Sequence, residues 1–177
     1  ISGVIIPKKT IYELSKLLSE TDSNIEISIS TNRIIFFIEG IIFFSKLIDG
    51  SFPDYKRVIP NNNSNILKIS RNKLLSAVDR VSTISNEKSP VIKFKLFNNI
   101  LNLNSVNNES STASEDLKIN YQGDEIEIGF NSKYIMDIVN NLQDEEISIN
   151  LKDNTSPITA QEKSSTNLVY VLMPMRV

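Results

Sequence analysis

The residue types on which most active sites depend are scarce in this chain of 177 residues. It contains no histidine and no cysteine, which removes the commonest general base, the commonest transition-metal ligand and all thiolate chemistry. Its five glycines form neither a G-x-x-x-x-G-K-[ST] nor a G-x-G-x-x-G phosphate-binding loop. The carboxylate run Asp144-Glu145-Glu146 lacks the spacing of a calcium loop and is typical of a solvated surface. We therefore expect no catalytic residue, no cofactor and no metal ion.

Basic side chains are clustered in two short segments, although the net charge of the chain is −2. Residues 8–18 and 71–83 each carry a local charge of +2, whereas residues 143–153 carry −3. The overall composition argues against binding to nucleic acid through net basicity, but local clusters could still contact phosphates. Ordinary solvated helix faces are the alternative explanation. The five candidate cations are Lys8, Lys9, Arg71, Lys73 and Arg80.

Three segments repeat one pattern, beginning at Pro7, Ser70 and Asn131, which lie 63 and 61 residues apart. Apolar residues follow each of these positions at +4, +7 and +11, a spacing that places them in one stripe of a helix. Proline, serine and asparagine are favourable at or near a helix N-terminus. The pattern predicts three amphipathic helices with these stripes: Ile11, Leu14 and Leu18; Leu74, Ala77 and Val81; Ile135, Ile138 and Leu142.

Short β-rich runs surround each predicted helix, one before it and three after it. Alternation such as Ile25-Glu26-Ile27-Ser28-Ile29 indicates antiparallel sheets with one buried face. The predicted fold class is therefore α+β, built from three β-α-β-β-β copies. The expected strands are 3–6, 24–30, 33–39 and 41–47, then 65–69, 91–97, 100–105 and 115–121, then 125–130, 146–151, 157–161 and 168–173.

Three copies do not divide evenly into domains. The second and third together have the length of an ordinary domain, so residues 63–177 are expected to form a complete one. A single copy has open sheet edges and an uncovered face. We therefore expect residues 1–62 to be the second half of a domain whose first half lies outside this chain.

Residues 45–60, SKLIDGSFPDYKRVIP, connect these parts. Pro53 and Pro60 lack an amide donor and exclude a long helix or a central strand. The segment also carries Phe52, Tyr55 and Val58, which are more apolar than a solvated linker requires. We expect another part of the protein, or a ligand, to pack on it.

Four stretches carry a family resemblance: residues 45–60, ISNEK at 84–88, EIGFNSKYIMDIVN at 127–140 and YVLMPMRV at 170–177. Together they resemble the bacterial sliding clamps, the beta subunits of DNA polymerase III. Members of that family form head-to-tail homodimeric rings, each subunit having three domains of two β-α-β-β-β copies, with helices around a hole for duplex DNA. The resemblance implies the DNA-clamp fold, with the orphan copy at the N-terminus belonging to the middle domain.

The resemblance also implies site residues. In the family, polymerases, the clamp loader and repair factors insert a short apolar peptide into a cleft between the middle and last domains. The matching positions are Pro53, Arg57, Val58, Asn131, Tyr134, Val171, Leu172, Met173, Pro174, Met175 and Arg176. The five cations named above would face DNA, and Thr83, Ile84 and residues 91–97 would form the dimer contact. The other cleft wall and the opposite dimer face have no counterpart here, so this chain is not expected to close a ring.

The leading hypothesis is thus a cytoplasmic processivity clamp, a non-catalytic subunit of the DNA polymerase III holoenzyme without membrane contact. Its partners would be duplex DNA, bound through the backbone, and replication and repair proteins. The alternative is an α+β small-molecule-binding domain or enzyme with a pocket at the hinge. The alternative requires convergent titratable groups in one cleft, whereas the clamp requires basic residues on the outer helix faces.

Overall fold

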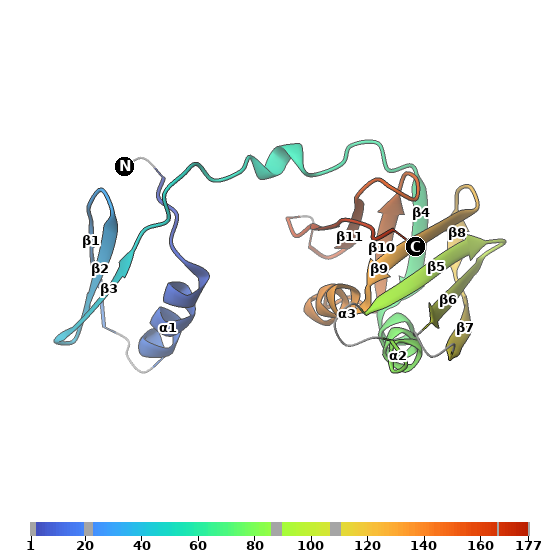
Figure 1. The fold of residues 1–177 in the computed structure, drawn as a ribbon, viewed down its shortest axis with the longest axis horizontal. Helices are drawn as coiled ribbons and strands as arrows, with labels where there is room; N and C mark the ends of the chain where they lie inside the picture. Colours follow the sequence, from blue (N-terminus) through green and yellow to red (C-terminus); the bar gives the residue numbers. More distant parts are fainter. Residues whose placement is uncertain (1–2, 20–22, 86–89, 107–110, 166, 177) are drawn as a thin grey trace. The chain divides into compact units, whose positions relative to one another are not determined.

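The computed structural model describes residues 3–19, 23–85, 90–106, 111–165 and 167–176 (Figure 1). The chain divides into two compact units, Ile1–Asp54 and Tyr55–Val177, called unit 1 and unit 2 below. The sequence placed a boundary between residues 62 and 63, whereas the units divide at the short 3-10 helix η1, Tyr55–Arg57. In the described parts of the chain, no helix is long and apolar enough to cross a membrane.

Unit 1 contains one helix and one sheet. The helix is α1, Lys8–Leu18, and the antiparallel sheet has the order β1-β2-β3, with β1 Glu26–Ile29, β2 Arg33–Ile38 and β3 Ile41–Lys46. Its core is small, because only four hydrophobic residues are buried among those described: Leu14, Ile34, Phe36 and Ile38. The strand predicted over residues 3–6 is reduced to one bridge between Ile5 and Ile48.

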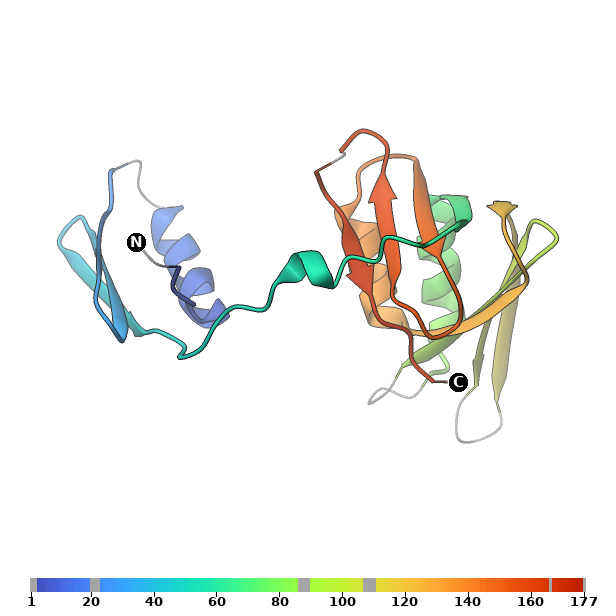
Figure 2. The same ribbon diagram turned by 90° about the horizontal axis from the view of Figure 1, so that it is seen from above.

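Unit 2 contains two antiparallel sheets (Figure 2). The four-stranded sheet has the order β7-β6-β5-β9, with β5 Val91–Phe97, β6 Ile100–Val106, β7 Thr112–Lys118 and β9 Ile126–Asn131. The five-stranded sheet has the order β12-β11-β10-β4-β8, with β4 Asn65–Ser70, β8 Asn120–Gln122, β10 Glu146–Leu151, β11 Ile158–Glu162 and β12 Tyr170–Leu172. The mixture of helices and antiparallel sheets confirms the α+β class.

One predicted strand is wrong in its extent. Residues 115–121 are divided between β7 and β8, which belong to different sheets. Asn99 fixes the place where the chain passes from β7 in one sheet to β8 in the other. Its carbonyl accepts from the Ile119 N–H at 3.0 Å, and its Oδ1 accepts from the Tyr121 N–H at 3.0 Å. Asn98 and Asn99 both have positive φ, as required by the tight turn from β5 to β6.

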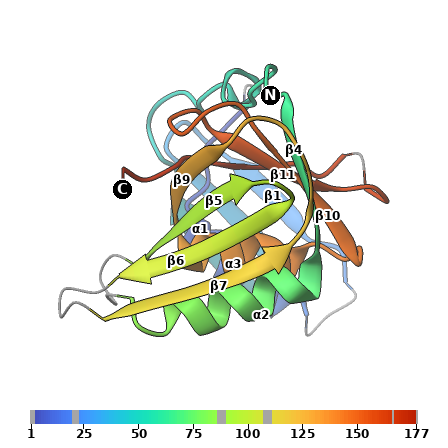
Figure 3. The same cartoon turned by 90° about the vertical axis from the view of Figure 1, so that its right-hand side faces the viewer.

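The three helices begin where the sequence predicted. Pro7, Ser70 and Asn131 are the N-cap residues of α1, α2 (Arg71–Ser82) and α3 (Ser132–Asn141), and Asn131 Oδ1 accepts from the Lys133 N–H at 3.0 Å. The stripes of α2 and α3 face the core, where α2 packs against α3 and against β7 (Figure 3). The α1 stripe is only partly covered: Leu14 is buried and Leu18 half-buried, but Ile11 is 47% exposed. Unit 1 contains no second helix that could cover Ile11 within its described residues.

The two copies in unit 2 exchange their first strands. β4 of the second copy pairs with β10 of the third, from Ser70 opposite Glu146 to Asn65 opposite Leu151. In return, β9 of the third copy pairs with β5 of the second. The exchange joins both copies in one core, in which the Phe94 and Phe130 rings meet edge to face with their centroids 5.2 Å apart.

Candidate functional site

The C-terminal tail lies beside the start of α3. β12 pairs with β11, and the tail then continues to Met175, whose main-chain N–H donates to the Gly129 carbonyl at 2.8 Å. Gly129 lies in β9, two residues before the N-cap Asn131. Tyr134, in the first turn of α3, is 56% exposed. The structure therefore places the predicted tail residues near the predicted residues of the third helix.

A hollow of about 280 Å³ runs along the tail. Its lining is mainly non-ionic, with two methionines and a proline, and comprises Asn154, Thr155, Met173, Pro174, Met175 and Arg176. Met173 is 58% exposed, so its flexible thioether is available to a ligand. Val171 and Leu172, both half-buried, lie in β12 directly before the hollow.

Asn154 and Thr155 were not predicted, and they come from the turn between β10 and β11. The Asp153 carboxylate organises this turn by accepting four hydrogen bonds. Oδ1 accepts from Thr155 N–H at 2.8 Å, Thr155 Oγ1 at 2.9 Å and Ser156 N–H at 2.7 Å, and Oδ2 accepts from Ser156 Oγ at 2.9 Å. These bonds, above all that from the Thr155 N–H, hold the pKa of Asp153 well below its usual value. The sequence signal was Asp-x-Thr-Ser, which is typical of a side-chain-capped turn.

The hinge residues lie in different units. Pro53 is an exposed residue of unit 1, whereas Arg57 and Val58 belong to the η1 turn at the start of unit 2. The Val58 N–H donates to the Tyr55 carbonyl at 3.0 Å, and Val58 is 51% exposed. Among the described residues, the lining of the tail hollow includes none of these three, nor Asn131 and Tyr134.

The predicted DNA-facing residues are all helical. Lys8 and Lys9 are exposed in the first turn of α1, and in the first turn of α2 Lys73 is exposed and Arg71 half-buried. Arg80 differs from them because Glu115 of β7 holds it by two contacts, Nε to Oε2 at 3.0 Å and Nη2 to Oε1 at 2.6 Å. These hydrogen bonds raise the pKa of Arg80 and lower that of Glu115.

The predicted dimer-contact residues follow α2. Thr83 is exposed and its Oγ1 donates to the Asp79 carbonyl at 3.0 Å, while Ile84 is half-buried. Residues 86–88 of the ISNEK motif lie outside the described residues.

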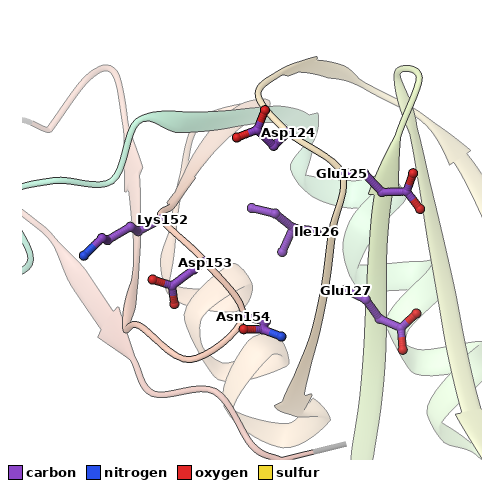
Figure 4. Close-up of a pocket in the computed structure, with 7 residues that line it drawn as sticks. All are labelled: Asp124, Glu125, Ile126, Glu127, Lys152, Asp153 and Asn154. Atoms are coloured by element: carbon purple, nitrogen blue, oxygen red, sulfur yellow. The ribbon is translucent and has the colours of Figure 1, made fainter.

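A second hollow of about 280 Å³ is rich in carboxylates and lies between β9 and the Asp153 turn (Figure 4). Figure 4 shows Glu125 and Glu127 pointing away from Asp153. They form ion pairs instead, Glu127 with Lys93 at 2.7 Å and Glu125 with Lys95 at 3.1 Å. Across the described parts of the chain, no three carboxylates converge closely enough to hold a metal ion.

Comparisons with known proteins agree with these features. The family profile of the DNA polymerase III beta subunit matches twice, its C-terminal domain at residues 56–176 and its central domain at residues 1–54. The chain belongs to the DNA polymerase III beta-subunit family. The resemblance to bacterial sliding clamps is therefore confirmed.

Alignment with curated relatives compares the length of this chain with that of complete clamps. The chain is 36% identical to the beta sliding clamp of Caulobacter vibrioides over 177 residues and 37% identical to that of Escherichia coli K12 over 175. The alignments cover 100% and 99% of this chain but 48% of each relative. The chain thus spans about half the length of the curated clamps that it matches.

Solved clamps have the same fold. A crystal structure of the DnaN sliding clamp from Bartonella birtlesii bound to griselimycin is 42% identical, with a TM-score of 0.89. The pol III beta of Caulobacter crescentus is 36% identical, with a TM-score of 0.90. Both matches cover 100% of this chain and 48% of the clamp chain, which confirms the DNA-clamp fold.

Proposed function

We propose that this chain is the C-terminal half of a processivity clamp. In full length, such a protein encircles duplex DNA as a homodimeric ring in the cytoplasm and holds the replicative polymerase on its template. Unit 1 is then the second half of the middle domain, and unit 2 is the complete last domain. The two family matches, at 1–54 and 56–176, support this division. The clamp is a non-catalytic subunit of the DNA polymerase III holoenzyme, and the comparisons do not favour the alternative of a small-molecule enzyme.

The hollow along the tail is the observation that carries the proposal. A short extended peptide gains most of its affinity by burying one or two apolar side chains, at about 25 cal/mol per Å² before ordering costs. Met173, Pro174 and Met175 offer an apolar surface for such side chains, and Arg176 offers a cation at the rim. Polymerases, the clamp loader and repair factors would bind here through peptide motifs. Griselimycin-bound clamps from Bartonella birtlesii and Pseudomonas aeruginosa support ligand binding within the family.

The predicted hinge residues complete the proposed cleft. Val58 would extend the apolar lining, and Pro53 and Arg57 would border the peptide. Asn131 and Tyr134 would contact it at the start of α3, near the Gly129–Met175 hydrogen bond. One wall of the cleft belongs to the absent half of the middle domain, so this chain should bind peptide more weakly than a full-length clamp.

The remaining surfaces have other proposed roles. Lys8, Lys9, Arg71 and Lys73 would attract DNA phosphates without contacting bases, and Arg80 would contribute less while paired with Glu115. Thr83, Ile84 and β5 would form the ring contact in the full-length protein.

Peptide titration tests the central claim. A fluorescent peptide with two adjacent large apolar residues should bind the chain, and removal of residues 173–177 should weaken binding at least tenfold. The control is Val106→Ser, which changes a 58% exposed apolar residue outside the hollow. Circular dichroism should show an intact unit 2 in both variants. Unchanged affinity after tail removal would place the peptide site elsewhere.

A further inference from the structure

The sulfur atoms of this chain are concentrated at the tail hollow. The chain has no cysteine and no tryptophan, so its three methionines are its most readily oxidised side chains. Met173 and Met175 both line the hollow. Met136, in α3, is half-buried and packs against the core of unit 2 instead. Two of the three oxidisable groups therefore lie where the peptide is proposed to bind.

Met173 is the most accessible of the three methionines. It is 58% exposed, whereas the other two are half-buried. The register of β11 and β12 would bring Pro157 opposite Met173, and a proline has no N–H to donate, so strand pairing stops just before Met173. Two residues later, the Met175 N–H donates to the Gly129 carbonyl at 2.8 Å. The backbone is thus held on both sides of Met173, while its thioether stays open to solvent.

These contacts all lie within unit 2, whose residues 56–176 match the profile of the C-terminal clamp domain. A longer protein would add a further wall to the proposed cleft, yet a cleft that admits a peptide also admits the much smaller peroxide molecule. The accessibility of Met173 to peroxide is therefore not a result of where this chain begins.

We propose that Met173 is a reversible oxidation site and that its oxidation by peroxides weakens peptide binding in the tail hollow. The Met173 sulfur attacks one oxygen of hydrogen peroxide, so that an S–O bond forms while the O–O bond breaks. The sulfur is oxidised by two electrons, and the departing hydroxide takes the proton of the transferred oxygen and leaves as water. Methionine sulfoxide reductases reverse the change with electrons from thiols. The oxidation rests on the exposure of Met173 alone, whereas its effect on binding rests on the proposed function.

Oxidation changes what the lining of the hollow offers to a ligand. A sulfoxide is polar, whereas the thioether of Met173 contributes apolar surface. The lining has polar groups on Asn154, Thr155 and Arg176. The Thr155 N–H and hydroxyl already donate to Asp153, at 2.8 and 2.9 Å. A sulfoxide oxygen would either stay in water or turn toward Asn154 or Arg176, and in both cases the peptide loses an apolar contact.

Peptide mapping by mass spectrometry tests the oxidation site. The 177-residue chain is treated with dilute hydrogen peroxide, and the gain of one oxygen is followed at each methionine. Because oxidation follows exposure, Met173 should react about tenfold faster than Met136. Denaturant should remove the difference, since it exposes both side chains. Equal rates in the folded chain, or a faster reaction at Met136 or Met175, would overturn the proposal.

Titration with the labelled peptide before and after peroxide treatment tests the effect on binding. The wild type should lose affinity by about fivefold or more, as expected when an unpaired polar atom is buried, and a methionine sulfoxide reductase should restore it. Met173→Leu, compared with its own untreated form, should keep its affinity. The matched variant Met136→Leu should lose affinity as the wild type does. Equal losses in the two variants would overturn the proposal.

Met173→Gln tests the change in polarity without an oxidant. It should bind the peptide about fivefold or more weakly than Met173→Leu, and equal affinities would contradict the proposed switching. If the untreated chain binds no peptide, the proposed function and the switching both fail, while peptide mapping still decides whether Met173 is an oxidation site. Binding that survives complete oxidation of Met173 overturns this inference alone.

Discussion

The main-chain N–H of Met175 donates a 2.8 Å hydrogen bond to the carbonyl oxygen of Gly129. This bond holds the tail against β9 close to the N-cap of α3. Met175→Pro removes the donor, whereas Met175→Leu keeps it together with most of the apolar volume. A typical hydrogen bond contributes about 0.5–1.5 kcal/mol, so the proline variant should bind peptide about 2- to 12-fold more weakly than the leucine variant. Fluorescence anisotropy measures the ratio, and equal affinities would show that the tail does not need this bond.

The Asp153 turn should make stability depend on pH. The folded-state pKa lies below the ordinary value of 3.8, so the hydrogen-bonded carboxylate stabilises the fold fully above that pH. This contribution is lost as the pH falls below 3.8 toward the lowered pKa. Asp153→Ala should therefore lower the melting temperature at pH 7, and the difference from the wild type should shrink in acid. A difference that is constant from pH 7 to pH 2.5 would contradict this.

The same variant should affect the tail hollow, because Thr155 lies in both the turn and the lining. Asp153→Ala should weaken peptide binding more than Asp153→Asn, which retains an acceptor oxygen for the Thr155 N–H. Titration at pH 7 with one labelled peptide compares the two. If both variants bind the peptide as the wild type does, Asp153 does not position the part of the tail hollow that Asn154 and Thr155 form.

Pairing with Glu115 should reduce the contribution of Arg80 to the proposed binding of DNA. Lys73→Ala removes an exposed cation and should lower the magnitude of the negative slope of log K against log salt by about 0.9 if one phosphate contact is lost. Arg80→Ala should lower it less, because the guanidinium is already engaged by a carboxylate. Glu115→Gln should strengthen DNA binding at low salt. These slopes can be measured with a labelled duplex, and a larger effect of Arg80→Ala than of Lys73→Ala would contradict the expectation.

Gly123 should be sensitive to any side chain. A Cβ atom at this position would lie 2.3 Å from Asn65 Oδ1, which accepts from the Asp124 N–H at 3.1 Å. Asn65 Nδ2 also donates to the Lys152 carbonyl at 2.9 Å, so the asparagine cannot move without losing contacts. Gly123→Ala should destabilise unit 2 by about 1–3 kcal/mol. Gly3→Ala, where nothing lies within 4 Å and φ is not positive, is the control in thermal melts and should cost less.

The sequence predicted the parts of this structure that depend on local signals. The N-caps Pro7, Ser70 and Asn131 were found because residue type and apolar spacing near a helix start are local properties. The division between β7 and β8 was missed because it depends on Asn99, about twenty residues earlier in the chain. The exposure of Ile11 is consistent with the uncovered face expected of a single copy, because the described residues of unit 1 contain no second helix to pack against it.

The candidate site, too, could be predicted from the sequence only in part. Met173 to Arg176 were identified through a family motif, but Asn154 and Thr155 reach the tail only after β10, β11 and β12 have paired. The pairing of Arg80 with Glu115, 35 residues away, could not be read from the basic cluster alone. Contacts of this kind are set by strand register, which short motifs do not encode.

The exchange of β4 and β9 also determines how unit 2 can fold. Asn65 must pair with Leu151 before the five-stranded sheet is complete, and Val91 must pair with Asn131 before the four-stranded sheet is complete. Such distant pairings require closure of long loops and slow the search for the native state. During synthesis, the second copy emerges from the ribosome while β10, one neighbour of β4, and β9, one neighbour of β5, still lie further along the chain. Unit 2 is therefore expected to acquire its structure in one late cooperative step, after β10 has left the ribosome.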